Sequence, residues 1–287
     1  MENEEVMRVI LSRKGFDSKY GGVPSPILTN GRMISLPIPD RDAPITYRAI
    51  QRDGLCLGDL AADLTRGKIP PTYRAHLDPD LEAQAVARPV GWRPAFGQSG
   101  AALCHLRKEG VMPGDLFLFF GWYRPVERVA NQWRYVRDSQ SVHALWGWMR
   151  IGAIHACGSL PKDVAGWATG HPHMSGPHPA QNDLLIAADD LVVAGRNLPG
   201  AGIFTSRQER VLTRQGATRS VWNMPAWMSP EFGMATLSYH GDRRRWSAVD
   251  TDTCQLRSAA IGQEFVLNVA KPELLDQWLT KLFTDIA

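Results

Sequence analysis

The sequence predicts an α+β fold in which a mixed β core is elaborated with helices and with long loops rich in proline and glycine. The chain has 287 residues, 44% of them hydrophobic and 21% charged, so it can bury a substantial core without disulfides. Short apolar runs typical of strands recur along the chain, whereas helical patterns are few. Strands and helices do not alternate regularly, so a doubly wound parallel sheet is not expected.

The first expected strand is the apolar run 6–11, which an irregular segment of residues 12–53 follows. Residues 55–64 have a short helical pattern, and 101–109 form a second expected helix that Gly110 is placed to end. The continuous apolar run 115–122 has the length of a strand buried on both faces. Further strands are expected at 133–136, 142–154, 184–187, 191–193, 210–212 and 264–267.

The chain ends in an expected amphipathic helix over residues 271–284, with Pro272 in its first turn. Residues 170–180 carry three prolines and two glycines and are expected to be a loop. No internal repeat is visible, so we expect residues 1–287 to form one elaborated domain.

Composition narrows the class of protein. The four cysteines lie far apart without a C-x-x-C pair, which argues against a zinc knuckle and fits a reducing compartment. No apolar run approaches the ~20 residues of a membrane span, and the acidic N-terminus lacks an apolar signal core. We therefore expect a cytoplasmic protein with no membrane partner. The net charge of +3 permits nucleic acid as a partner without requiring it.

Polar residues and glycines follow the first expected strand closely. Cationic side chains together with glycine backbone can bind an anion, and the cluster fits a phosphate or the edge of a nucleotide. A structural turn with surface charges explains it equally well. Its candidate ligand-binding residues are Arg13, Lys14, Tyr20, Gly21 and Gly22, with Asp17 as a candidate acid or base.

Acids and histidines form a second group. Asp78 and Asp80 follow His76, and Asp40 ends a proline-rich segment, so these residues suit acid–base or metal chemistry. Asp-Pro-Asp is also a common turn sequence. At the start of the helix 101–109, Gln98 and Gly100 let a ligand approach, and His105 is a further catalytic candidate. The plain alternatives are a helix cap and a core histidine.

Aromatic and basic residues suggest contacts with nucleic acid. Trp146 and Trp148 share one face of a strand and, with Trp122, suit an aromatic pocket for a base. His171 and His173 lie one residue apart in the proline-rich loop and suit a metal or a ligand, although a hydrogen-bonded loop explains them as well. The sequence also has basic stretches, which suit either contact with nucleic acid or a solvated surface. Their candidate nucleic-acid-binding residues are Arg207, Arg210, Arg214, Arg243, Arg244 and Arg245.

Taken together, several of these segments resemble the nucleotide modification associated domain 3 family. The segments are 9–18, 20–27, 35–40, 76–80, 114–122, 145–148 and 171–173. The resemblance covers most of the chain and implies a context of DNA base hypermodification in phages and bacteria, without a defined reaction. The candidate residues that it carries over are Arg13, Lys14, Asp17, Asp40, His76, Asp78, Asp80, Gln98, His105, Asp115 and His173.

A second resemblance is at the level of fold. The sequence from Gly114-Asp115 to residues 143–152 is similar to the EVE and ASCH members of the PUA-like superfamily. Those small β-barrels often hold a flipped or modified base in an aromatic pocket. The resemblance implies a PUA-like core at roughly 110–215.

Three functions follow as hypotheses. The first is recognition of a modified, flipped base in DNA through an aromatic pocket and a basic surface. The second is an enzyme on a modified base or nucleotide that uses aspartate and histidine for acid–base or metal chemistry. The third is a structural subunit of a DNA modification or restriction complex, with a role in phage defence as context. Binding ranks above catalysis because no complete catalytic set is visible, and the sequence identifies no metal or cofactor.

Overall fold

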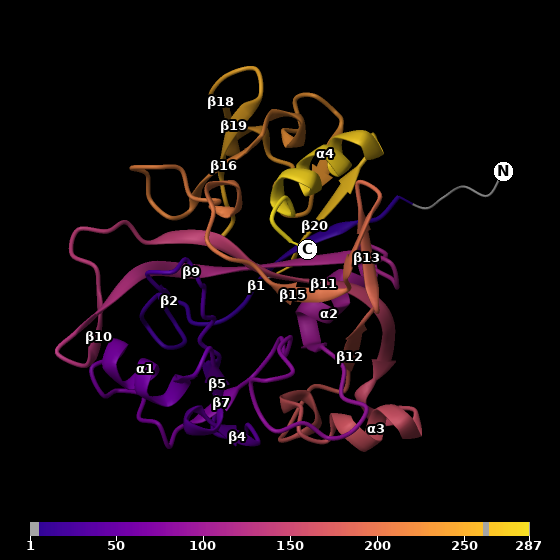
Figure 1. The fold of residues 1–287 in the computed structure, drawn as a ribbon. Helices are drawn as coiled ribbons and strands as arrows, with labels where there is room; N and C mark the ends of the chain where they lie inside the picture. The colour runs from indigo at the N-terminus through magenta and orange to yellow at the C-terminus, as the bar shows by residue number, and fades with distance from the viewer. Residues whose placement is uncertain (1–5, 261–263, 287) are drawn as a thin grey trace.

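A ten-stranded mixed sheet forms the centre of the protein in the computed structural model, which describes residues 6–260 and 264–286 (Figure 1). Its order is β17-β20-β1-β9-β11-β12-β8, with β2 and β10 paired to β9 and β15 paired to β11. Its strands are β1 (Val9–Arg13), β2 (Ser25–Ile27), β8 (Ala95–Ser99), β9 (Leu116–Val129), β10 (Gln132–Tyr135), β11 (Val142–Ala156), β12 (Asn182–Ala187), β15 (Ala201–Ile203), β17 (Ala235–Leu237) and β20 (Glu264–Val269).

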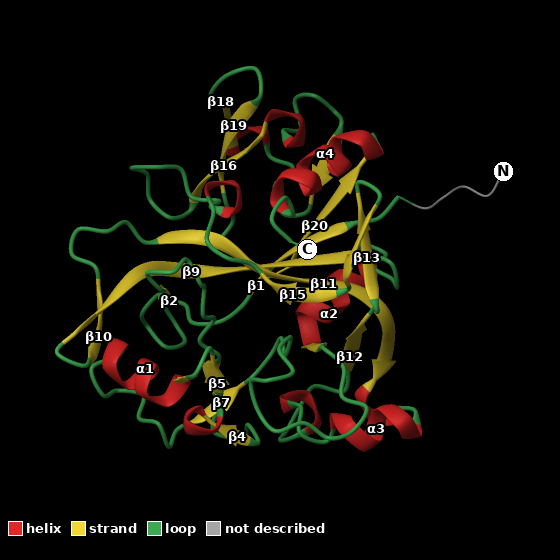
Figure 2. Cartoon of the chain, viewed as in Figure 1, coloured by secondary structure: helices red, strands yellow, loops and turns green. Residues whose placement is uncertain are grey.

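Smaller elements lie on both sides of this sheet, and loops account for much of the chain (Figure 2). The small sheets are β3 (Ile38–Pro39), β7 (Arg74–His76) and β4 (Ile45–Thr46); β5 (Gln51–Arg52) and β6 (Leu55–Cys56); β13 (Asp190–Val193) and β14 (Arg196–Pro199); and β16 (Val221–Pro225), β19 (Thr253–Arg257) and β18 (Trp246–Ala248). The α-helices are α1 (Leu57–Leu64), α2 (Gly100–Lys108), α3 (Lys162–Ala168) and α4 (Pro272–Leu282). Short 3-10 helices cover Tyr47–Ala49, Cys157–Ser159, Pro172–Met174, Gln208–Arg210, Ala226–Met228 and Arg243–Arg245.

Strand pairing makes the central sheet mixed. β1 runs parallel to β9, with Arg13 beside Phe120, and antiparallel to β20, with Ser12 beside Glu264. β9 and β11 are antiparallel, and their register shifts between Leu145 and Gly147, as at a β-bulge. Together with the four α-helices of the described residues, this arrangement confirms the predicted α+β class.

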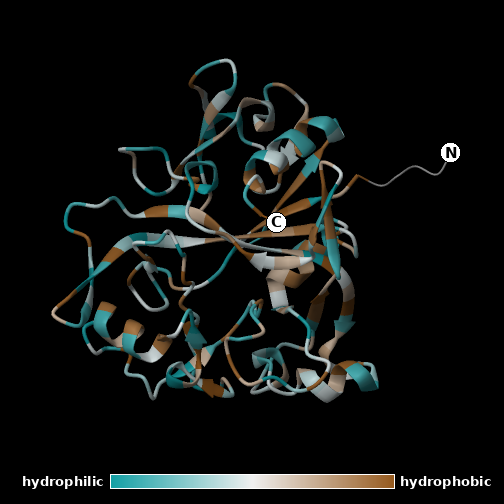
Figure 3. Cartoon of the chain, in the orientation of Figure 1, coloured by the Kyte–Doolittle hydropathy of each residue, from teal (hydrophilic) through white to brown (hydrophobic). Residues whose placement is uncertain are grey.

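The buried core follows the apolar strands, which are brown at the centre of Figure 3. Leu116–Phe120 is at most 1% exposed, as expected for a strand covered on both faces. β9 continues past this run to Val129. A turn at Ala130 and Asn131, both with positive φ, then reverses the chain, so that β10 pairs with the end of β9. No described helix is long and apolar enough to cross a membrane.

Two expectations need correction. The segment 210–212 is not a strand: Gln208–Arg210 is a 3-10 helix, and Val211 makes only an isolated bridge to Ala144. Trp146 and Trp148 are 1% and 3% exposed and pack in the core, because both faces of β11 are covered there. They therefore cannot line a surface pocket for a base.

Candidate metal centre

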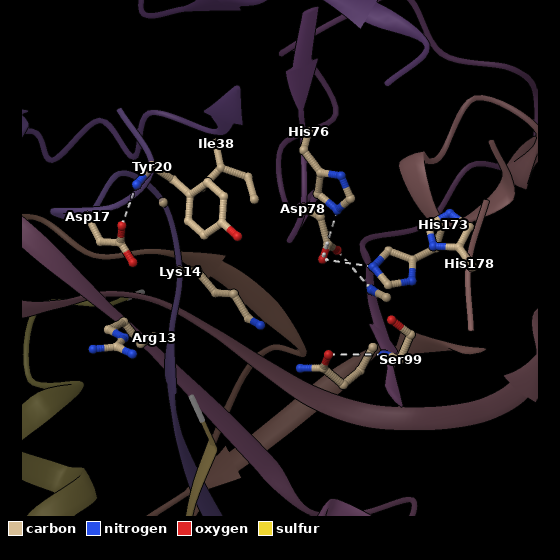
Figure 4. Close-up of a pocket in the computed structure, with 13 residues that line it drawn as sticks. Arg13, Lys14, Asp17, Tyr20, Ile38, His76, Asp78, Ser99, His173 and His178 are labelled. Carbon is tan, nitrogen blue, oxygen red and sulfur yellow. Dashed lines mark hydrogen bonds and ion pairs between the residues drawn. The ribbon is translucent and has the colours of Figure 1, made fainter. Parts of the chain in front are cut away.

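A pocket of about 220 Å³ opens beside the ends of β1, β7 and β8 (Figure 4). Its walls come from segments that are distant in the sequence and include the loop around His173. Figure 4 shows Arg13 and Asp17 on one side of the pocket and His76, Asp78 and His173 on the other. The lining residues are Arg13, Lys14, Gly15, Asp17, Tyr20, Ile38, His76, Asp78, Gly97, Gln98, Ser99, His173 and His178.

Two histidines and one aspartate converge in this pocket. His76, Asp78 and His173 each offer a ligand atom within 4.8 Å of the others. Oδ2 of Asp78 lies 3.9 Å from Nε2 of His76 and 3.7 Å from Nε2 of His173. Ligand atoms that sit about 2.0–2.2 Å from a shared ion are roughly 3.0–3.5 Å apart, so a metal requires only a small contraction of this group.

Hydrogen bonds direct the Nε2 lone pair of each imidazole toward Asp78. Nδ1 of His76 lies 2.8 Å from Oδ2 of Asp40, and this carboxylate accepts its proton. Asn182 donates from Nδ2 to the carbonyl of His173, so its Oδ1, 2.6 Å away, accepts the Nδ1 proton of His173. With Nδ1 protonated in a neutral ring, Nε2 is free to bind a metal. Such partners are typical of metal-binding histidines.

The charge states also suit a metal. Burial lowers the pKa of His173 to about 4, so its ring is neutral near pH 7. Burial of Asp78 opposes ionisation, but the neighbouring His171, His173 and His76 side chains hold the pKa of Asp78 well below its usual range. Asp78 is therefore a carboxylate although its side chain is only 5% exposed. Neutral imidazoles and an ionised carboxylate are the forms that bind metals.

The two oxygens of Asp78 have different partners. Oδ1 accepts the backbone N–H of Gly97 at 2.8 Å and lies 3.4 Å from Nε2 of His171. Nδ1 of His171 accepts the backbone N–H of His173, which places the proton of His171 on Nε2, facing Asp78. Because these contacts are made by Oδ1, the other oxygen of Asp78, Oδ2, faces the pocket. His171 thus orients Asp78 from behind rather than lining the pocket.

Short strands assemble this group. β3 pairs with β7, which places Ile38 beside His76 and brings Asp40 within reach of the imidazole. β12 pairs with β8, which places Asn182 beside Ser99 and holds the His173 loop over Gly97. A Cβ atom on Gly97 would lie 2.2 Å from the ring of His173, so the closeness of the histidine requires glycine here.

Lys14 and Gln98 reach into the pocket from a buried polar network. Nζ of Lys14 lies 3.0 Å from Oε1 of Glu264, and Nε2 of Gln98 donates to the same oxygen at 2.6 Å. Glu264 is 1% exposed. The carboxylate therefore balances the charge of Lys14. Oε1 of Gln98 accepts from the Ser99 backbone, so its amide has a partner at each end.

The pocket brings together many of the predicted residues, while others lie elsewhere. Asp80 forms a two-point ion pair with Arg88. His105 contacts Ser238, and Asp115 accepts backbone N–H groups of Arg8 and Met112. Gly100 begins α2 with positive φ. These four positions have structural explanations and do not line the pocket.

The glycines and Trp122 near the strand end also have local roles. Gly21 lies against Phe16, whose ring a Cβ atom would meet at 2.3 Å, whereas Gly22 faces open space. Trp122 lies under the guanidinium of Arg219, which is 4.1 Å from the ring centre.

The basic residues are mostly engaged within the fold. Arg210 is 1% exposed and donates to the carbonyls of Leu282 and Thr205, so the prediction that it holds nucleic-acid phosphate is corrected. Arg207 pairs with Glu209, and Arg244 with Asp242. Arg245 donates to the carbonyl of Arg257. For Arg207, Arg214, Arg243, Arg244 and Arg245, a role with nucleic acid stays a prediction.

Sequence reasoning missed several residues that build the site. Asn182 and Glu264 act as partners of His173 and Lys14, and Gly97 provides space for an imidazole. The available signal was a polar residue at the first position of each apolar strand, β12 and β20. A polar side chain at such a position can turn toward a site at the sheet edge.

A family model matches most of the chain. The model described as nucleotide modification associated domain 3 matches residues 8–268, which include every residue of the pocket. No curated protein and no solved structure matches the chain. The chain belongs to the nucleotide modification associated domain 3 family.

Proposed function

We propose that this protein is a metal-dependent enzyme of nucleotide modification, with a divalent ion held by His76, Asp78 and His173. The observation that carries the proposal is the convergence of two imidazole Nε2 atoms on one oxygen of a buried carboxylate. If His76 and His173 only formed a hydrogen-bonded loop, their two Nδ1 protons would not both need partners on the side of the ring away from Asp78. Metal-binding histidines commonly have this arrangement.

The ligand set favours a catalytic ion over a structural one. Structural zinc sites are closed by four protein ligands, whereas two histidines and one carboxylate leave positions open for water or substrate. Fe²⁺, Mn²⁺, Co²⁺ and Zn²⁺ all accept this set. An ion there supplies a Lewis acid. Asp40 and Asn182 hold the imidazoles, and His178 stacks on His173 with ring centres 4.9 Å apart.

The pocket restricts what reaches the ligands. Its volume of about 220 Å³ is below the roughly 300–1,000 Å³ of pockets that enclose a whole drug-sized ligand. We therefore expect it to admit the reacting part of a nucleotide, with the remainder outside. Arg13, Lys14 and Tyr20 line the approach.

The convergence of His76, Asp78 and His173 favours catalysis over simple base recognition. The rings of Trp146 and Trp148 are buried, so they do not offer a stacking surface to a base. Recognition of a flipped base in DNA, a PUA-like core, the extent of a single domain, a cytoplasmic location and assembly with modification or restriction proteins stay predictions. They do not affect the metal proposal.

Turnover tests the proposal. The purified protein is stripped of metal, supplied anaerobically with Fe²⁺, Mn²⁺, Co²⁺ or Zn²⁺, and incubated with modified and unmodified nucleotides and oligonucleotides. Mass spectrometry should find a changed nucleotide with at least one metal and none with Asp78→Asn. His155→Asn removes a histidine of β11 outside the pocket and should retain turnover. Equal product from the Asp78→Asn protein would contradict the proposal.

A further inference from the structure

A groove of about 770 Å³ lies between the end of α1 and the strand β10. α1 and β10 lie side by side at one edge of the molecule (Figure 1). Every residue of β10 lines the groove, and none of the lining residues also lines the pocket of the metal group. The groove is therefore a second, separate candidate site.

Contacts within the fold give the groove its shape. Oδ2 of Asp63 accepts the backbone N–H of Trp133 at 2.9 Å, which ties α1 to β10. The hydroxyl of Tyr135 donates to the carbonyl of Pro24 at 2.6 Å. Trp133 and Tyr135 alternate on β10 and pack on one side against the hydrophobic cluster around α1. Both rings are thus held in place while they line the groove.

The lining of the groove has an excess of positive charge. Arg66, Arg124 and Arg134 face one carboxylate, that of Asp63, so two positive charges remain. Arg124 and Arg134 donate hydrogen bonds to neutral oxygens. Within residues 6–260 and 264–286, no carboxylate forms an ion pair with any of these three arginines. The groove is therefore complementary to a polyanion.

Cation–π contacts place charges beside the rings. The guanidinium of Arg124 lies 5.3 Å from the ring centre of Tyr135, and that of Arg128 lies 5.9 Å from the ring centre of Trp133. Arg128 and its neighbour Glu127 are exposed and add one charge of each sign, which leaves the balance unchanged. Grooves for single-stranded nucleic acid combine cations for the phosphates with aromatic rings for unpaired bases.

We propose that the groove between α1 and β10 binds single-stranded nucleic acid. Its arginines contact the phosphates, and the rings of Trp133 and Tyr135 lie beside unpaired bases. A duplex offers phosphates but hides the faces of its bases, so the rings favour a single strand. Phosphate contacts and stacking do not read base edges, so binding should tolerate any sequence. This inference goes beyond the proposed metal chemistry and does not depend on it.

Fluorescence anisotropy tests the inference on the full-length protein with EDTA present, which separates the result from metal binding. A labelled ten-nucleotide oligothymidine is compared with oligouridine, a duplex of the same length, an abasic strand of the same charge and a polyglutamate peptide. One of the two single strands with bases should bind most tightly, and the tighter one identifies DNA or RNA as the source. Three phosphate contacts predict that log affinity falls with log salt at a slope near −2, a roughly twentyfold loss between 50 and 200 mM salt.

The double variant Arg66→Gln/Arg134→Gln should bind oligothymidine roughly tenfold to hundredfold more weakly at 50 mM salt, with a slope near −0.7. Both side chains are exposed, so the fold should be retained, and thermal unfolding checks this. Arg243→Gln/Arg244→Gln is the matched control. It removes two charges from exposed positions of a basic stretch outside the groove.

Weaker binding and a shallower slope in the groove variant, with wild-type affinity in the control, support the proposal. No binding of either single strand by the wild-type protein, unchanged affinity in the groove variant, or an equal loss in the control overturns it. Binding of the abasic strand or of polyglutamate as tight as that of oligothymidine would remove the role of the bases and also overturn it. Tighter binding of the duplex would contradict the choice of a single strand.

Discussion

Oδ2 of Asp40 lies 2.8 Å from Nδ1 of His76, on the opposite side of the ring from Asp78. The contact sets the tautomer of His76 and therefore which nitrogen faces the pocket. Asn182 does the same for His173 at 2.6 Å. Two partners from separate segments thus prepare two imidazoles for one site.

Asp40→Asn should weaken metal binding without abolishing it. The amide keeps a hydrogen-bond acceptor but removes the negative charge behind the His76 ring, and losses of this kind cost about 10–100-fold in affinity. Titration with Co²⁺ measures the change. Asp42→Asn, an exposed residue two positions away, is the matched control. An affinity unaltered by Asp40→Asn would show that this contact does not serve a metal.

Gly97→Ala should disrupt the site although glycine contributes no ligand. The added Cβ would lie 2.2 Å from the ring of His173, so the imidazole must move away from Asp78. We expect loss of Co²⁺ binding together with some loss of thermal stability. Gly158→Ala adds the same methyl group in open space and should change neither. Normal Co²⁺ affinity in Gly97→Ala would refute this placement of His173.

Stability should fall in mild acid, in part through His240. Burial lowers the pKa of His240 to about 4, and its Nε2 accepts the backbone N–H of Ala259 at 2.9 Å. The unfolded chain binds the proton more readily, with a pKa of about 6.5. The contribution of His240 is therefore complete above about pH 6.5 and is lost as the pH falls toward 4.

Urea unfolding at pH 7.5 and pH 5 measures this effect in the wild-type protein and in His240→Gln. Glutamine can accept the same N–H without titrating, so the variant should lose less stability between the two pH values. A pH dependence as steep as that of the wild-type protein would exclude His240 as a contributor.

Arg210→Gln should destabilise the fold rather than affect ligand binding. Its guanidinium donates to the Leu282 carbonyl and pairs with Asp285 next to the C-terminal helix. Leaving a buried carbonyl unpaired costs about 1–3 kcal/mol. Chemical denaturation should show this loss, whereas Arg207→Gln, with a side chain 43% exposed, should stay near the wild-type value. Weakened nucleotide binding by folded Arg210→Gln would restore a role with nucleic acid.

The sequence predicted the elements whose signals are local. The apolar run at 115–122 and the segment 142–154 became β9 and β11, and the pattern near residue 271 became α4. The aromatic pocket could not be judged in the same way. Alternation places Trp146 and Trp148 on one face of a strand, but it does not say that neighbouring strands and loops bury that face.

The site was predicted as separate pieces. Asp40, His76, Asp78 and His173 were each candidates, yet a turn or a loop explained them equally well. Their meeting depends on two-residue and three-residue strands, β3 and β7, and on the pairing of β8 with β12. Such pairings join segments tens of residues apart and leave no periodic pattern in the sequence, so only the folded structure shows that the ligands converge.

Metal binding tests the central claim most directly. Co²⁺ is titrated anaerobically into the metal-free wild-type protein and into Asp78→Asn, His76→Ala and His173→Ala, with binding followed by calorimetry and visible absorption. The account predicts one Co²⁺ per wild-type chain, with absorption bands typical of nitrogen and oxygen ligands, and loss of binding in all three variants. No binding by the wild-type protein, or equal binding by the variants, would contradict it.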